Sequence, residues 1–176
     1  MLNNTQRQID LYEDDSNPLN AVEEILLNND WHFDRLAENR LSVTVSGQYS
    51  HYTMSFFWQE EYQALQFCGT TDVVVLPQRF DEAAKMLNKI NSSLWLGHFD
   101  ITQDQSDPMC FIPCFRHTTL LRGQDARSSL PAIEDLIDVA IHECERHYTA
   151  FSLLETLSSQ PSSNMALALM DVAGRS

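Results

Sequence analysis

Basic side chains are scarce in this chain. Its 176 residues contain 11 lysines and arginines against 25 aspartates and glutamates, so the formal net charge is −14. Such an excess of negative charge repels phosphate backbones and anionic lipids, and nucleic-acid binding depends on clustered basic residues. The composition therefore argues against nucleic acid and against a membrane surface as partners.

Long apolar runs are also missing. No stretch approaches the roughly 18 consecutive apolar residues that suggest a membrane-spanning helix. Residues 1–16 carry Asp10, Glu13, Asp14 and Asp15 where a secretion signal would have a basic and an apolar segment. We therefore expect no membrane partner and a cytoplasmic location.

Cysteines are few for a disulfide scaffold. The chain has four, Cys68, Cys110, Cys114 and Cys144, and reduced, buried thiols are the expectation. Three residues separate Cys110 from Cys114, one more than in a redox or zinc CxxC motif. Along an ideal strand their Cα atoms would be about 13 Å apart, too far for a disulfide. The pair is therefore predicted to be two small core residues.

Glycine and proline number only 5 and 6, and 43% of the residues are hydrophobic, which is a globular composition. The length suits one domain, predicted over residues 17–172. Residues 1–16 offer too little apolar surface to offset their ordering entropy, so they are predicted to be a disordered acidic tail. Residues 173–176 form a short C-terminal tail.

Apolar residues spaced for one helix face predict the N-terminal and central helices. The first is expected over residues 18–29, with Asn17 as cap and proline at the first helical position. The second begins after Pro77 and is expected to end near Leu96, because Gly97 suits the left-handed position that follows a helix.

The same spacing is clearest in the last long helix. It is expected to open with Ser128 or Ser129 as cap and to hold a buried stripe, centred on Ile137, through Phe151. A short amphipathic helix is predicted to begin near Pro161.

Between the helices the hydrophobic period changes to two, which is typical of strands. A hairpin turns at Glu38-Asn39, and further strands are predicted at residues 52–58, 65–76, 97–103 and 109–121. Isolated helices between runs of strands indicate an α+β fold. We predict an antiparallel sheet of five to six strands with helices on one face, in the order α-β-β-β-β-α-β-β-α-(α).

Two features of these strands predict a partner. Phe57 points away from the other large residues of its strand, and the unbroken run Val73 to Val75 suggests a central strand that is covered on both faces. One layer of helices cannot cover both faces, so we expect a homodimer or another protein to do so. The possible interface residues are Phe57, Val74, Trp95, His98, Arg116 and His117.

Several motifs in fixed order resemble the YbjN domain family. They are Asn17-Pro18-Leu19, the segment from Leu94 to Asp100, Phe115-Arg116-His117 with Leu120 to Gly123, and Glu143 to Arg146 with Tyr148 and Phe151. The resemblance implies a fold similar to that of type III secretion chaperones. It also implies a role in bacterial sensory transduction regulation, with no catalytic residues and no cofactor.

Catalysis is the alternative that the residues leave open. His98, Asp100 and His117 could meet across neighbouring strands, where a His-Asp pair would suit a small metal-dependent or hydrolytic enzyme. His142 and His147 are five positions apart, roughly 140° around a helix, and are expected on a mostly solvated face without a metal. The sequence has no glycine-rich phosphate loop and no nucleophile elbow. The preferred function is therefore a non-enzymatic protein-binding module, chaperone-like or regulatory.

Overall fold

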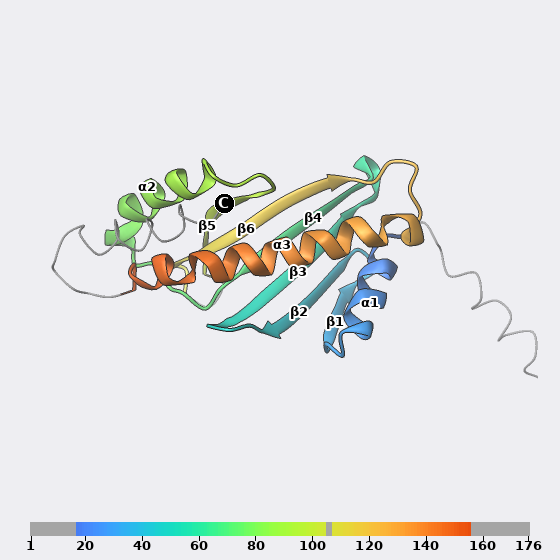
Figure 1. The fold of residues 1–176 in the computed structure, drawn as a ribbon, viewed down its shortest axis with the longest axis horizontal. Coiled ribbons are helices and arrows are strands. Elements are labelled where there is room, and N and C mark those ends of the chain that lie inside the picture. The colour runs from blue at the N-terminus through green and yellow to red at the C-terminus, as the bar shows by residue number, and fades with distance from the viewer. Residues whose placement is uncertain (1–16, 105–106, 156–176) are drawn as a thin grey trace, which may run out of the picture.

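The computed structural model describes residues 17–104 and 107–155, in which one six-stranded antiparallel sheet is packed against three α-helices (Figure 1). This confirms the predicted α+β class and element order. The predicted helix near Pro161 and both predicted tails lie outside the described residues. The strands are β1 Phe33–Ala37, β2 Arg40–Ser46, β3 His51–Gln59, β4 Ala64–Thr70, β5 His98–Gln103 and β6 Phe111–Leu120, and the α-helices are α1 Leu19–Asn28, α2 Phe80–Asn91 and α3 Ala126–Ser152.

The sheet order is β1-β2-β3-β4-β6-β5. The first four strands form a meander, in which each strand pairs with the next. The chain then leaves the sheet for α2 and returns at the edge with β5, and β6 fills the position between β5 and β4. Helices α1 and α3 lie across one face of the sheet, and α2 lies beside β5 (Figure 1).

Helix α3 spans 27 residues and supplies the main cover of the sheet. Its first turn is closed by a capping box. Asp125 accepts a 2.7 Å bond from the backbone N–H of Ser128, and the Ser128 hydroxyl accepts one from the backbone N–H of Asp125. The expectation that Ser128 or Ser129 is the cap was wrong, because the helix begins at Ala126 and the preceding Asp125 accepts from the backbone N–H of Ser128. The predicted stripe is buried, with Ile137 only 1% exposed.

The core lies between α3 and the covered face of the sheet. Leu41, Met54 and Phe56 point into it from β2 and β3, each at most 1% exposed. From there a chain of aromatic ring contacts crosses the core, with centroids 5.0–6.3 Å apart, and it runs through Phe56, Phe67, Phe115, Phe99 and Phe151. These edge-to-face contacts connect four strands to the C-terminal half of α3.

The apolar run Val73 to Leu76 is not part of a central strand, as the sequence had suggested. Strand β4 ends at Thr70, and the next residues form a loop that meets β6 only through an isolated bridge between Val75 and Phe111. The Thr71 hydroxyl accepts a bond from the backbone N–H of Val73, a local turn that competes with strand pairing. Val73 and Val75 are nevertheless fully buried, within their own chain.

Helix α2 ends at Asn91, before the predicted Leu96. The hydroxyls of Ser92 and Ser93 donate to the carbonyls of Lys89 and Ile90, so they satisfy acceptors at the end of the helix. Gly97 does have a positive φ of 66°, but it serves the entry into β5, where a Cβ would overlap the Phe115 ring.

Candidate functional site

The face of the sheet opposite α1 and α3 is not covered by a described helix. We call it the helix-free face. The strand register places its side chains in three rows, each of which crosses at least four strands. The first row is Asp34, Ser42, Ser55, Cys68, Arg116 and His98, the second is Thr44, Thr53, Thr70, Cys114 and Asp100, and the third is Arg40, Phe57, Gln66 and Thr118.

Most of this face consists of small polar side chains, which differs from the apolar second face that the sequence suggested. Ser55, Thr53 and Thr118 are exposed, and the hydroxyls of Thr44 and Thr53 lie 3.2 Å apart across β2 and β3. This polar face was not predicted from the sequence, because the fourth strand was expected to extend to Leu76. The apolar run Val73 to Leu76 then made both faces of that strand look hydrophobic. The face is therefore flat and wettable, with few large groups standing out from it.

Two arginines and their partners form the charged points of the face. The guanidinium of Arg40 lies over the ring of Phe57, 5.6 Å from its centroid, and shields this apolar ring. Leu120, which is 57% exposed, lies on the same face of β6 as Arg116. The Arg116 side chain lies 3.4 Å from the Asp100 carboxylate, and both are about half exposed. An exposed pair of this kind contributes little stability, so Arg116 and Asp100 retain the capacity to pair with other groups.

Cys68 on β4 and Cys114 on β6 form a disulfide across the helix-free face, with Cα atoms 6.3 Å apart. The expectation of reduced thiols was therefore wrong for this pair. Cys68 lies directly opposite Arg116, so Cys114, two residues earlier on β6, is its diagonal neighbour on the same face. No sequence pattern predicts this contact, because 46 residues separate the two cysteines and only the register of β4 against β6 brings them together.

Three of the six predicted interface residues, Phe57, His98 and Arg116, lie on the helix-free face. The other three do not. His117 lies on the covered face opposite Phe67, Val74 is half-buried in the loop after β4, and Trp95 is 76% exposed in the loop between α2 and β5. Whether any of the six contacts a partner stays a prediction.

The predicted grouping of His98, Asp100 and His117 is divided between the two faces. Asp100 pairs with Arg116 on the helix-free face, whereas His117 alternates to the covered face. Burial, together with the nearby His98, holds the pKa of His117 below its usual value. Among the described residues, no group of three or more His, Cys, Asp or Glu side chains is arranged to hold a metal ion.

Neither edge of the sheet is a regular, open strand over its whole length. At β5, the Asn91 side chain from α2 donates to the Phe99 carbonyl at 2.9 Å and accepts from the Phe99 N–H at 2.7 Å, as a neighbouring strand would. At β1, the register shifts between Arg35 and Ala37. Such irregular or covered edges do not accept a further strand readily.

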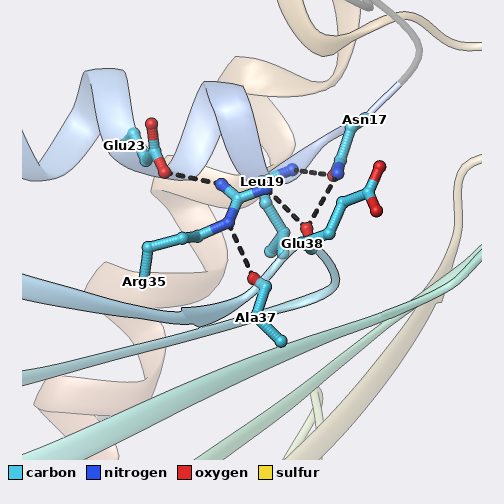
Figure 2. Close-up of polar contacts among 6 residues, drawn as sticks. All are labelled: Asn17, Leu19, Glu23, Arg35, Ala37 and Glu38. Atoms are coloured by element: carbon cyan, nitrogen blue, oxygen red, sulfur yellow. Dashed lines mark hydrogen bonds and ion pairs between the residues drawn. The ribbon is translucent and has the colours of Figure 1, made fainter.

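The Arg35 side chain joins the β1 edge to the start of α1. Figure 2 shows its guanidinium in contact with the Glu23 carboxylate, at 2.5 Å, and with the carbonyls of Ala37 and Glu38. Asn17 bonds to the same Glu38 carbonyl and accepts from the Leu19 N–H. The helix begins one residue later than predicted, so Pro18 and not Asn17 holds the N-cap position. Because all these groups bond one another, we assign the cluster a structural role.

Two open hollows of about 590 Å³ each adjoin this cluster. One lies between α1 and the start of α3, and the other lies between the β1–β2 turn and the 3-10 turn η1, Glu60–Tyr62. Asn17 and Glu38 line both hollows. The charged lining of the second hollow is entirely glutamate, whereas Arg35 and Arg127 accompany the glutamates of the first.

A buried polar pair on α3 was missed by the sequence analysis. Glu143 and His147 are 4% and 1% exposed, whereas the predicted surface of this helix segment was solvated. His147 Nε2 lies 3.4 Å from Glu143, and the imidazole packs against the rings of Phe99 and Phe151. The contact with His147, and the Arg146 guanidinium, hold the pKa of Glu143 below its usual value despite burial.

The sequence matches the YbjN family over residues 18–153, from the start of α1 to the end of α3. This protein belongs to the YbjN family. The family is described as "Putative bacterial sensory transduction regulator". No curated protein matches the chain.

The YbjN assignment agrees with a solved structure. The crystal structure of YbjN, "a putative transcription regulator from E. coli", is similar to this chain with a TM-score of 0.50 and 13% sequence identity. The similarity covers 74% of this chain and 93% of that chain. At this identity it establishes the fold. No helix among the described residues is long and apolar enough to cross a membrane.

Proposed function

We propose that this YbjN-family protein is a non-catalytic, protein-binding regulatory module and that the helix-free face is its binding surface. One observation carries the proposal. The face extends over all six strands without a covering helix among the described residues, while Asn91 bonds part of the β5 edge and a register shift makes β1 irregular. A partner that docks on this sheet is therefore expected to meet the side chains of the face first, because neither edge is a regular open strand.

The chemistry of the face suits a protein partner. Arginine and aromatic residues are enriched in protein interfaces, and the face offers Arg116, Arg40 and the half-exposed Phe57 among small serines and threonines. Its charges are of both signs, since Asp34 and Asp100 accompany the arginines. A surface of mixed sign in a chain of net charge −14 favours a protein over a polyanion.

A second copy of this chain is one partner that could use the face, in a chaperone-like dimer. The run Val73 to Val75 does not support a homodimer, because Val73 and Val75 are buried within one subunit. The proposal of a dimer now rests on the helix-free face alone. Light scattering on the untagged protein distinguishes a mass near 20.2 kDa from one near twice that value.

The binding surface is tested by charging its centre. Thr53→Glu combined with Ser55→Glu places two carboxylates on exposed positions of β3 without disturbing the core. We expect this variant to melt like the wild type, to lose self-association if the dimer exists, and to lose proteins that co-purify from a native bacterial lysate. Lys85→Glu, on the exposed side of α2, is the matched control and should retain them.

Two results would refute the proposal. One is that the Thr53 and Ser55 variant keeps the wild-type mass and the wild-type set of co-purifying proteins. The other is that Lys85→Glu loses the same proteins, which would show that added negative charge and not the position is responsible.

A further inference from the structure

Cys68 and Cys114 stand out among the four cysteines of the chain because only these two are joined. They belong to β4 and β6, adjacent strands in the middle of the sheet, and their Cα separation of 6.3 Å falls within the usual disulfide range. The bond lies on the helix-free face. Cys68 is only half-buried there, so small solutes can approach this end of the bond without any displacement of α1 or α3.

The two sulfurs differ in their surroundings. Cys68 is half-buried, whereas Cys114 is fully buried. Arg116 is the direct cross-strand neighbour of Cys68, and a neighbouring guanidinium favours the thiolate, which is the reactive form of cysteine. Cys68 is therefore placed to react with a molecule from solution, and Cys114 is placed to resolve the product.

The other two cysteines are held as unreactive thiols. The Cys110 thiol donates to the Asp107 carboxylate at 3.3 Å, and this contact raises the pKa of Cys110. Burial raises the pKa of Cys144 to about 12. Both differ from Cys68, which has a cation as neighbour.

We propose that Cys68 and Cys114 form a reversible thiol–disulfide modification site on the helix-free face, with small disulfides of the glutathione type as co-substrates. In the oxidising direction, the Cys68 thiolate attacks a glutathione disulfide, and one glutathione thiolate leaves. The Cys114 thiolate then attacks the Cys68 sulfur and releases the second glutathione. Two protein thiols are oxidised, one small disulfide is reduced to two thiols, and the reverse steps reduce the protein.

The bond has a mechanical consequence for the fold. It joins β4 to β6 and closes a segment that contains α2 and β5, so oxidation ties β6, and β5 through its pairing with β6, more firmly to β4. Loop closure of this length is expected to raise the melting temperature of the oxidised protein by roughly 5–10 °C. The redox state of the environment thereby sets the rigidity of one half of the helix-free face.

The test counts free thiols in glutathione buffers. Purified untagged protein is equilibrated at graded ratios of reduced to oxidised glutathione, quenched with acid, denatured and alkylated with a maleimide for mass spectrometry. We expect two alkylated cysteines in oxidising buffers and four in reducing buffers, with one sharp transition. Cys68→Ser should abolish the transition, whereas Cys110→Ser should keep it, with one fewer alkylated cysteine throughout.

The kinetics add a second readout that does not depend on how the cysteine variants fold. Arg116→Gln should slow the first oxidation step several-fold, while Arg40→Gln, elsewhere on the same face, should leave it unchanged. Four alkylated cysteines in every buffer would overturn the proposal. So would two in every buffer, including a large excess of reduced glutathione, or a transition that survives in both Cys68→Ser and Cys68→Ala.

Discussion

Removing His147 should destabilise the protein more than its polar character suggests. The side chain is 1% exposed, and its ring packs on Phe99 and Phe151 with centroids 5.7 and 6.4 Å away. His147→Ala deletes those ring contacts, at about 0.5–1.5 kcal/mol. It also leaves a buried Glu143 oxygen without its nearest polar neighbour, at about 1–3 kcal/mol. We expect a total loss of about 2–4 kcal/mol, reduced toward the lower value by the remaining Arg146.

The double variant separates the two contributions. Replacement of a buried ion pair by apolar residues of similar size is often neutral or stabilising, whereas removal of one partner is costly. Glu143→Leu with His147→Leu should therefore unfold within about 1 kcal/mol of the wild type in urea, and His147→Leu alone should be clearly less stable. Glu134→Gln, on the exposed side of α3, is the control. If the double variant loses at least the sum of the two single losses, the carboxylate and imidazole are not a compensating pair.

The same pair predicts a pH dependence. Because the pKa of Glu143 is lowered in the folded state from its reference value of 4.5, its stabilising effect is complete above that value. The effect is lost as the pH falls through the lower, folded-state value. Urea titrations at decreasing acidic pH should show wild type losing stability more steeply than Glu143→Gln. Parallel curves for the two proteins would contradict the assignment.

Three further predictions concern packing and the sheet edge. Ile137→Asp should prevent folding at ambient temperature, as seen by circular dichroism, because it buries an unpaired charge under α3, whereas Glu134→Gln should leave the spectrum and melting temperature unchanged. Gly47→Ala should lower the melting temperature more than Gly69→Ala, because a Cβ at Gly47 would overlap the Tyr52 ring, whereas the nearest atom to a Cβ at Gly69 lies at 3.3 Å; equal shifts would refute this explanation. Asn91→Ala should increase the hydrogen exchange rate of the Phe99 amide, measured by NMR, and an unchanged rate would show that the Asn91 side chain does not protect it.

Most of the fold could be predicted because local pattern and tertiary burial agree. In β3 the large residues Tyr52, Met54 and Phe56 point to the covered face, and the small polar residues between them point to the other face, as the period of two predicts. The stripe around Ile137 similarly defines the buried side of α3. The order of elements and the family resemblance follow from such segments.

The wrong predictions have a different cause. They concern places where the structure depends on a side chain that bonds the backbone or on contacts between strands far apart in the sequence. Thr71 turns the chain before Val73, so the hydrophobic run that follows is packed as a loop. The contact between Cys68 and Cys114 depends on strand register, which period-two patterns do not define. The polar side chains of a single strand likewise do not show which residues of other strands lie beside them. The set of residues that forms the helix-free face could therefore not be predicted.

The position of β6 between β4 and β5 also constrains how the protein is made. Among the described strands β5 pairs only with β6, which follows it in the chain. A nascent chain that has emerged from the ribosome through β5 can therefore complete the four-stranded meander but has no partner for its newest strand. During that interval α2 and β5 are attached to the folded part only by the connecting loop. This interval ends when β6 has been synthesised, because β6 pairs with both β4 of the meander and β5. Helix α3 follows β6 directly in the chain and can then cover the sheet.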